Sequence, residues 1–167
     1  VDLLTDHGFD LWQGRAGTGG NRLVLIAAGG IDLVDQRSDL RCRCFDGRNI
    51  ALRRLADQAA AAPDTAYAVT FNNTDLSAGV YRGTPTSRIY VDRPGAYNFQ
   101  FSIQFESTNA ASKDVYVWAR INGSDVSNSA TKIHMQGANQ AYVAAWNFVI
   151  RMNTGDYFEL MWATTNT

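Results

Sequence analysis

The side chains that could perform chemistry are few and scattered along this sequence of 167 residues. It has two cysteines, Cys42 and Cys44, and two histidines, His7 and His134. On a strand, the single residue between the cysteines would place both thiols on one face, but a disulfide across so short a loop is strained. A metal site needs more ligands, and the histidines lie far away in the sequence. We therefore expect two reduced thiols and a fold without disulfides, which suits assembly in a reducing cytoplasm.

Known catalytic motifs are absent from the sequence: it contains no G-x-S-x-G, no H-E-x-x-H and no Walker A loop. The glycine-rich segment 14–20 lacks the Lys-Ser/Thr pair of a phosphate loop, which favours a flexible arm. Asp114, Asp125 and Asp156 could bind calcium, but no clustered Asp-x-Asp pattern supports this, and solvated turn carboxylates are expected. His134 is expected to be exposed or to lie at an interface. We therefore expect no enzyme, no cofactor and no metal.

The charge balance excludes several classes of partner. Fifteen Lys and Arg residues against sixteen Asp and Glu residues give a net charge of −1. The sequence therefore lacks the excess of positive charge that binding to a phosphate backbone needs. The longest apolar run, 23–28, is far shorter than the roughly 18 residues that a membrane span needs. The first residues are acidic, so a secretory signal is not expected. We expect neither a nucleic acid nor a membrane partner.

The clearest local pattern lies between Tyr97 and Glu106, where large apolar residues alternate with polar ones without exception. A period of two is typical of a strand with one buried face. Asn122-Gly123 favours a type I′ turn because both residues tolerate positive φ. About eight strands at this spacing predict an all-β, antiparallel sandwich. The other expected strands are 66–71, 88–91, 113–121, 125–135, 141–152 and 157–162. The expected core is Tyr97, Phe99, Phe101, Ile103, Phe105, Phe148, Phe158 and Leu160.

A change in composition near residues 58–66 predicts two parts, an N-terminal extension over 1–65 and the sandwich domain over 66–167. The extension is expected to hold short strands over 23–28, 31–34 and 40–45, with Gly29-Gly30 as a hairpin turn between the first two. A helix is expected over 50–62, because Ile50, Leu52, Leu55 and Ala59 would share one side, with Asn49 as its cap and Pro63 at its end.

Three segments of the second part carry a resemblance to a known family. Arg93-Pro94-Gly95-Ala96-Tyr97-Asn98-Phe99 matches a P-G-x-Y-x-F signature, and Val117 to Gly123 looks like a hairpin ahead of an N-G turn. Met152 to Leu160 is similar to a closing hairpin of the form L-x-x-G-D-x-[VF]-x-L. These motifs resemble those of the trimeric jelly rolls typified by the complement globular head and tumour necrosis factor. The resemblance covers 66–167 and implies a TNF-like jelly roll.

Large aromatic residues occur on both faces of some expected strands. In a sandwich the outer face of a strand is buried only by a partner. Together with the resemblance, this predicts a homotrimer. The interface candidates are Tyr116, Trp118, Tyr142 and Tyr157.

The resemblance also suggests a biological setting, because bacteriophage virions use trimeric jelly rolls in capsid decoration proteins and in fibre tips. Charged residues make up only 19% of the sequence, and a neutral polar surface suits stable protein contacts. The leading hypothesis is a trimeric cement protein that stabilises a phage head by binding the major capsid protein or another virion protein, assembled in the host cytoplasm. The N-terminal extension would anchor it through arginines that pair with lattice carboxylates: Arg15, Arg22, Arg37, Arg41, Arg43, Arg48, Arg53 and Arg54.

The alternative hypothesis is a receptor-binding tip domain of a tail fibre or spike that recognises a host glycan. Exposed Trp and Tyr residues with amide and carboxylate neighbours could form a sugar site. The polar loops expected over 72–87 and 107–113 would supply it.

Overall fold

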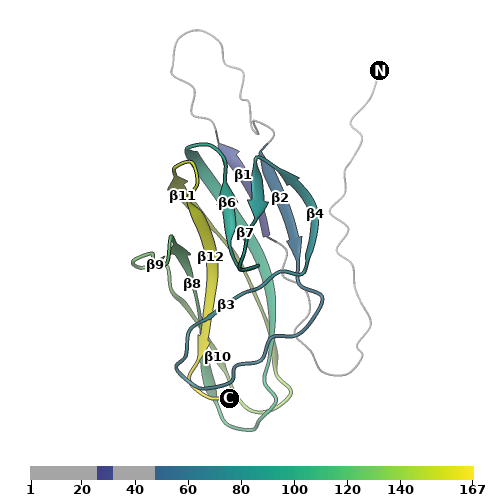
Figure 1. Ribbon diagram of the computed structural model, residues 1–167. Helices are drawn as coiled ribbons and strands as arrows, with labels where there is room; N and C mark the ends of the chain where they lie inside the picture. The colour runs from purple at the N-terminus through teal and green to yellow at the C-terminus, as the bar shows by residue number, and fades with distance from the viewer. Residues whose placement is uncertain (1–25, 32–47) are drawn as a thin grey trace, which may run out of the picture.

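The computed structural model describes residues 26–31 and 48–167, and over these residues the chain consists of strands and loops without an α-helix. Two sheets with antiparallel strands pack against each other as a β-sandwich (Figure 1). The first sheet has the order β11-β7-β1-β2-β4, and the second has the order β10-β8-β12-β6-β5. Two short strands extend the second sheet, since β3 pairs with β12 and β9 pairs with β8. The predicted all-β sandwich is therefore confirmed.

The first sheet comprises β1 (Ile26–Ile31), β2 (Asn49–Arg53), β4 (Asn73–Ala78), β7 (Gly95–Glu106) and β11 (Ala141–Met152). The second comprises β5 (Val80–Arg82), β6 (Ile89–Val91), β8 (Lys113–Ile121), β10 (Thr131–Met135) and β12 (Tyr157–Thr164), with β3 (Tyr67–Ala68) and β9 (Ser124–Asp125) added.

The alternating segment between Tyr97 and Glu106 lies in β7, in the middle part of the first sheet. The strand pairs along its whole length with β11, from Gly95 opposite Met152 to Glu106 opposite Ala141. Its five large apolar side chains are buried between the sheets. Phe99 stacks on Phe158 of the facing sheet, with ring centroids 4.1 Å apart and ring planes 7° apart. Leu160 is also buried, whereas Phe148 is half-buried at the side of the sandwich.

The helix expected over 50–62 is wrong. Residues Asn49–Arg53 form β2, with Ile50 and Leu52 buried on alternate positions. Over so few residues the pattern of apolar residues fits the period of a helix as well as that of a strand. The strand forms because β1 and β4 pair with this segment on either side. The following alanine-rich stretch is irregular. It is held to β3 by the hydroxyl of Tyr67, which accepts from the backbone N–H groups of Ala61 and Ala62 at 2.9 and 2.8 Å.

The predicted hairpin turn at Gly29-Gly30 is also wrong, because both glycines lie inside β1. This strand pairs with β2 on one side and with β7 on the other. The two described strands of the predicted N-terminal extension thus belong to the first sheet. The strand expected over 40–45, with Cys42 and Cys44, lies outside the described residues, as do His7 and the glycine-rich segment 14–20.

The turn predicted at Asn122-Gly123 is confirmed, since both residues have positive φ, 49° and 82°, and they join β8 to β9. The single strand expected over 125–135 is divided into β9 and β10. The strand expected over 66–71 is reduced to β3, and the polar loop expected over 72–87 contains β4 and β5.

Candidate partner-binding face

Three tyrosines from three neighbouring strands stand in one row on the outer face of the second sheet. Tyr81 lies opposite Tyr90, and Tyr90 lies opposite Tyr157. The first two rings stack with centroids 5.5 Å apart, and the next pair is 5.3 Å apart with a tilt of 48°. The guanidinium of Arg88 lies 4.4 Å from the centroid of the Tyr157 ring. We call these four residues the tyrosine ladder.

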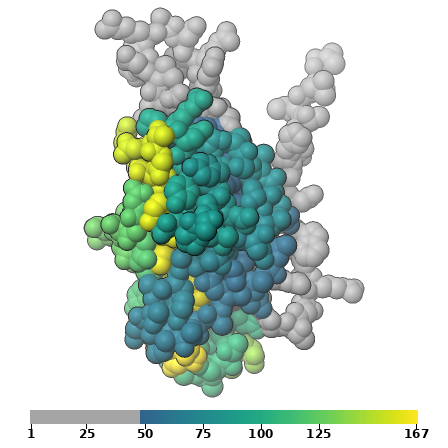
Figure 2. Space-filling model, in the orientation of Figure 1, coloured from purple at the N-terminus to yellow at the C-terminus, as the bar shows by residue number. Residues whose placement is uncertain are grey.

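The same outer face continues across β8. Because Val115, Val117 and Ala119 are buried, the residues between them point away from the core. Figures 1 and 2 look onto this side of the molecule, where β12, in yellow, runs between β8, in green, and β6, in teal. We call the whole surface the second-sheet face; it consists of the tyrosine ladder together with Asp114, Tyr116, Trp118, Arg120, Lys132 and His134.

Polar and charged groups on this face bind one another. The indole Nε1 of Trp118 donates to Asp125 Oδ1 at 2.8 Å, and Arg120 Nε donates to the same oxygen at 2.7 Å. Both bonds hold the pKa of Asp125 below its ordinary value, and the bond from Arg120 contributes most. The Asp125 carboxylate therefore stays ionised and fixes the side chains of Trp118 and Arg120.

Two more carboxylates neutralise the remaining cations of the face. Asp114 contacts His134 Nδ1 at 2.6 Å and Lys132 Nζ at 3.4 Å, and the bond to His134 is the main cause that lowers the pKa of Asp114. Glu159 accepts from the Ser87 hydroxyl at 2.6 Å and lies 3.7 Å from Arg88 Nε. The three cations Arg88, Arg120 and Lys132 are thus matched by the three carboxylates Glu159, Asp125 and Asp114. The face is thus aromatic and without net charge.

Three of the four predicted interface residues share this face. Tyr116, Trp118 and Tyr157 all lie on it and are half-buried within the single chain. Tyr142 does not join them, because it lies on β11 of the first sheet, opposite Phe105, and is 43% exposed.

The sequence interpretation missed Tyr81, Tyr90 and Arg88. A signal was present, because Tyr90 stands between Ile89 and Val91, so that this short strand has large residues on both faces. The segment around Tyr81 was taken for a polar loop, and without its strand the partner of Tyr90 could not be found.

Arg48, one of the predicted anchoring arginines, is used inside the domain. Its side chain is 8% exposed. Its Nη1 donates to the hydroxyl of Tyr97 at 3.0 Å and to the carbonyl of Pro94 at 3.4 Å. The guanidinium also lies over the Tyr97 ring, 5.3 Å from the centroid. A buried guanidinium of this kind supports the fold and has little surface to offer a lattice.

Two further arginines make contacts within the chain. Arg53 Nε pairs with Asp75 Oδ2 at 2.5 Å. Arg54 donates to the hydroxyl and the carbonyl of Thr70. The other five predicted anchoring residues lie outside the described part of the chain: Arg15, Arg22, Arg37, Arg41 and Arg43.

The three aspartates considered for calcium do not come together. Asp114 and Asp125 are held by the partners given above, while Asp156 accepts from Asn122 Nδ2 and from the backbone N–H of Asn153, each at 2.7 Å. Residues 26–31 and 48–167 contain no group of three side chains suited to a metal ion.

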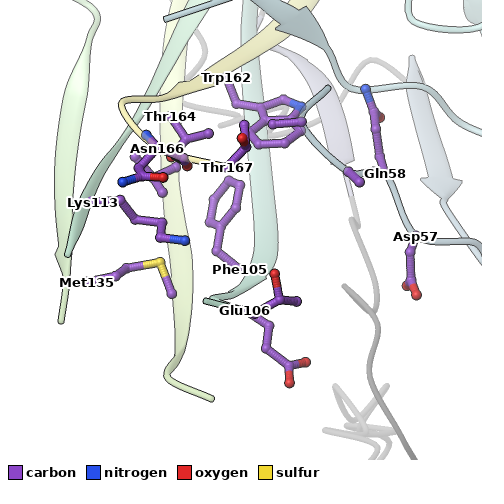
Figure 3. Close-up of a pocket in the computed structure, with 14 residues that line it drawn as sticks. Asp57, Gln58, Phe105, Glu106, Lys113, Met135, Trp162, Thr164, Asn166 and Thr167 are labelled. Carbon is purple, nitrogen blue, oxygen red and sulfur yellow. Dashed lines mark hydrogen bonds between the residues drawn. The ribbon is translucent and has the colours of Figure 1, made fainter. Parts of the chain in front are cut away.

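A cleft opens at the end of the sandwich where β7, β8, β10 and β12 meet an irregular segment over 57–60 (Figure 3). Its volume is about 290 Å³. Its base consists of buried apolar side chains, and Lys113 lies on one wall. We call it the end cleft; its base is formed by Phe105, Val115, Met135 and Trp162.

Within the described segments there is no helix long and apolar enough to cross a membrane. Comparison with known proteins assigns no relative, since no protein-family model and no curated protein matches this sequence.

Proposed function

We propose that this chain is a non-enzymatic structural protein of a virion, a trimeric cement protein whose copies contact one another through the second-sheet face. The observation that carries this proposal is the aromatic, charge-balanced surface formed by the tyrosine ladder and the outer side of β8. Aromatic residues are enriched at protein interfaces, and net charge is depleted from their centres.

The orientation of the tyrosine rings favours a protein partner over a sugar. Tyr81 and Tyr90 stack with only 10° between their planes, on strands that lie side by side. Each of these two rings therefore turns a flat side toward the other, and that side is closed to a ligand. Ring edges and hydroxyl groups pack well into a protein surface, whereas a sugar needs an open ring face.

The charge balance favours a second copy of this chain as the occupant. A surface that meets its own copy brings like charges together unless they are already neutralised. Here Arg88, Arg120 and Lys132 each have a carboxylate partner in the same chain. In a trimer this face meets a different surface of the next copy, and it can be buried there without an uncompensated charge of its own.

Three copies and the jelly-roll class are part of the proposal. They rest on the resemblance of the segments at Pro94, Asn122 and Gly155 to the trimeric jelly-roll family. The strand orders are compatible with it, since β12 lies between β8 and β6 and β7 lies between β11 and β1, which requires long crossing connections.

The anchoring role is assigned to Arg15 and Arg22, the two predicted anchoring arginines that precede β1. Because β1 and β2 are members of the first sheet, removal of the first sixty residues would take two strands out of the fold. Removal of 1–25 leaves both strands in place. We expect this truncated chain to remain folded and trimeric but to lose its binding to the particle.

The first test is the mass in solution, by size-exclusion chromatography with light scattering at micromolar concentration. We expect three times the chain mass of 18.4 kDa. Tyr116→Glu should release monomers, because it places an unpaired charge in the contact. Tyr142→Glu is the matched control: the same substitution on the first sheet should leave the trimer intact.

A monomeric wild-type chain would refute the assembly proposal, and a trimer broken only by Tyr142→Glu would move the interface to the first sheet. The virion assignment is tested separately. Gold-labelled antibody against the purified chain should decorate purified phage particles from the source culture, and unlabelled particles would refute that part.

A further inference from the structure

The end cleft has features of a binding site for a small molecule, independent of the second-sheet face. It draws residues from the ends of four strands and from two loops that lie far apart in the sequence. Its volume of about 290 Å³ is near the lower limit of roughly 300 Å³ for ligand pockets. The space therefore fits one compact molecule, such as a single sugar unit, and excludes a longer chain from the interior.

Lys113 is the feature that points to the chemistry of the ligand. The residue is only 7% exposed, although lysine is almost never buried without a partner. Its Nζ donates to the side-chain oxygen of Asn109 at 2.9 Å. Among the described residues no carboxylate oxygen lies within 4.0 Å of this Nζ. An ammonium group has three donors, so a neutral amide oxygen leaves most of this charge without compensation.

The acidic residues of the cleft do not supply that compensation. Asp57 and Glu106 lie on its rim, and Figure 3 shows their carboxylates pointing away from Lys113, whose amino group points toward the base. The carboxylate of Asp57 on the rim can instead accept hydrogen bonds from hydroxyl groups. Thr108 and Asn166 add further polar groups around the opening.

From these contacts we infer that the end cleft binds an acidic monosaccharide, with the ligand carboxylate on Lys113 and its hydroxyl groups on the polar rim. The apolar base of Phe105 and Trp162 lies beneath the ring of the sugar. A bound acidic sugar explains why the buried Lys113 lies on the wall of the cleft beside an apolar base. It matches the ordinary composition of sugar and cofactor sites, a mainly apolar cavity with a few polar groups that fix orientation.

The experiment compares D-glucuronate with D-glucose, because the two sugars differ by a carboxylate in place of a hydroxymethyl group. Binding to the wild-type chain is followed by NMR titration. We expect D-glucuronate to shift the resonances of Lys113 and of the Trp162 indole, with an affinity at least tenfold above that of D-glucose. N-acetylneuraminate, a larger acidic sugar, tests whether the volume limits the ligand.

Lys113→Met removes the charge and keeps most of the chain length of the side chain. We expect it to weaken D-glucuronate binding about tenfold or more and to leave the trimer mass unchanged. Arg151→Met is the control, since it also removes a cation and this arginine lies exposed on β11, outside the second-sheet face and the end cleft. It should not change binding.

Three results would overturn the inference: no binding of either acidic sugar, equal binding of D-glucose, or shifts that map to the second-sheet face. The wild-type titration decides these points even if the Lys113 variant does not fold. A trimer that binds no acidic sugar refutes the end-cleft site alone, and a monomer that binds one refutes only the assembly proposal.

Discussion

Removal of one hydroxyl group, by Tyr97→Phe, tests whether the buried Arg48 supports the fold. Tyr97 is fully buried, and its hydroxyl accepts from Arg48 Nη1 at 3.0 Å and donates to the carbonyl of Arg93 at 2.7 Å. The substitution keeps the ring, so the packing against Phe99 and the contact of the guanidinium with the ring face remain. The change therefore removes the hydrogen bonds of the hydroxyl group and keeps the packing of the ring.

The magnitude follows from the burial of the two groups. A hydrogen bond to a charged group contributes roughly 1.5–3 kcal/mol, and a neutral one about 1 kcal/mol. The Arg93 carbonyl lies in an exposed turn and can bind water instead. The loss at Arg48 dominates, and we expect about 2 kcal/mol in the free energy of unfolding. For a chain of this size, that lowers the melting temperature by roughly 4–8 °C.

The assay is urea unfolding with thermal unfolding as a second measurement, on the chain without residues 1–25 as well as on the full chain. Tyr142→Phe is the control, since it removes a hydroxyl from an exposed ring. A double-mutant cycle with Arg48→Met measures the coupling between the pair. A loss below about 0.5 kcal/mol for Tyr97→Phe, or no coupling in the cycle, would refute a structural role for Arg48.

Two further predictions concern the second-sheet face. Gly83→Ala should weaken trimer formation and lower the stability of the chain by about 1 kcal/mol, because a Cβ at this glycine would overlap Cε2 and Cδ2 of the Tyr90 ring. Light scattering measures the trimer, and thermal unfolding measures the stability. An unchanged trimer would contradict the role of the tyrosine ladder. Asp125→Asn should lower stability at pH 7, because the folded chain holds the pKa of Asp125 below its ordinary 3.8 through Arg120. A lowered carboxyl pKa stabilises the fold above the unfolded value and ceases to do so as the pH falls through the folded value. The difference from wild type should therefore narrow as the pH falls below 3.8. Urea unfolding at a series of pH values from pH 7 downward checks this, and a difference that does not narrow below pH 3.8 would contradict it.

Sequence reasoning succeeded where a long segment carried one period. Ten alternating residues from Tyr97 to Glu106 predict a strand with a single buried face, and β7 has that form. It failed between Ile50 and Ala62, where the apolar residues fit a helix as well as a strand. The irregular stretch after β2 is held by contacts with Tyr67, and no local signal indicates them.

The candidate sites likewise contain residues that the sequence indicated and residues that it did not. Large residues on both sides of β8 indicated a covered outer face, and Tyr116 and Trp118 lie on that face. The tyrosine ladder could not be predicted from the sequence, because Tyr81, Tyr90 and Tyr157 become neighbours only when three strands pair in one register. The same holds for Lys113 in the end cleft, because its distance from the carboxylates of the described residues follows from the packing of several strand ends.

By itself, the sequence determined the class of fold, the central strand β7 and the turn at Asn122-Gly123, because alternation and positive φ are properties of adjacent residues. The tertiary structure decided that β1 and β2 join the first sheet, that Arg48 is buried, and that three tyrosines form one row. The physical reason is that hydrogen bonds between strands, and the desolvation of a charge, depend on residues distant in the sequence. Their register is fixed only when the two sheets pack.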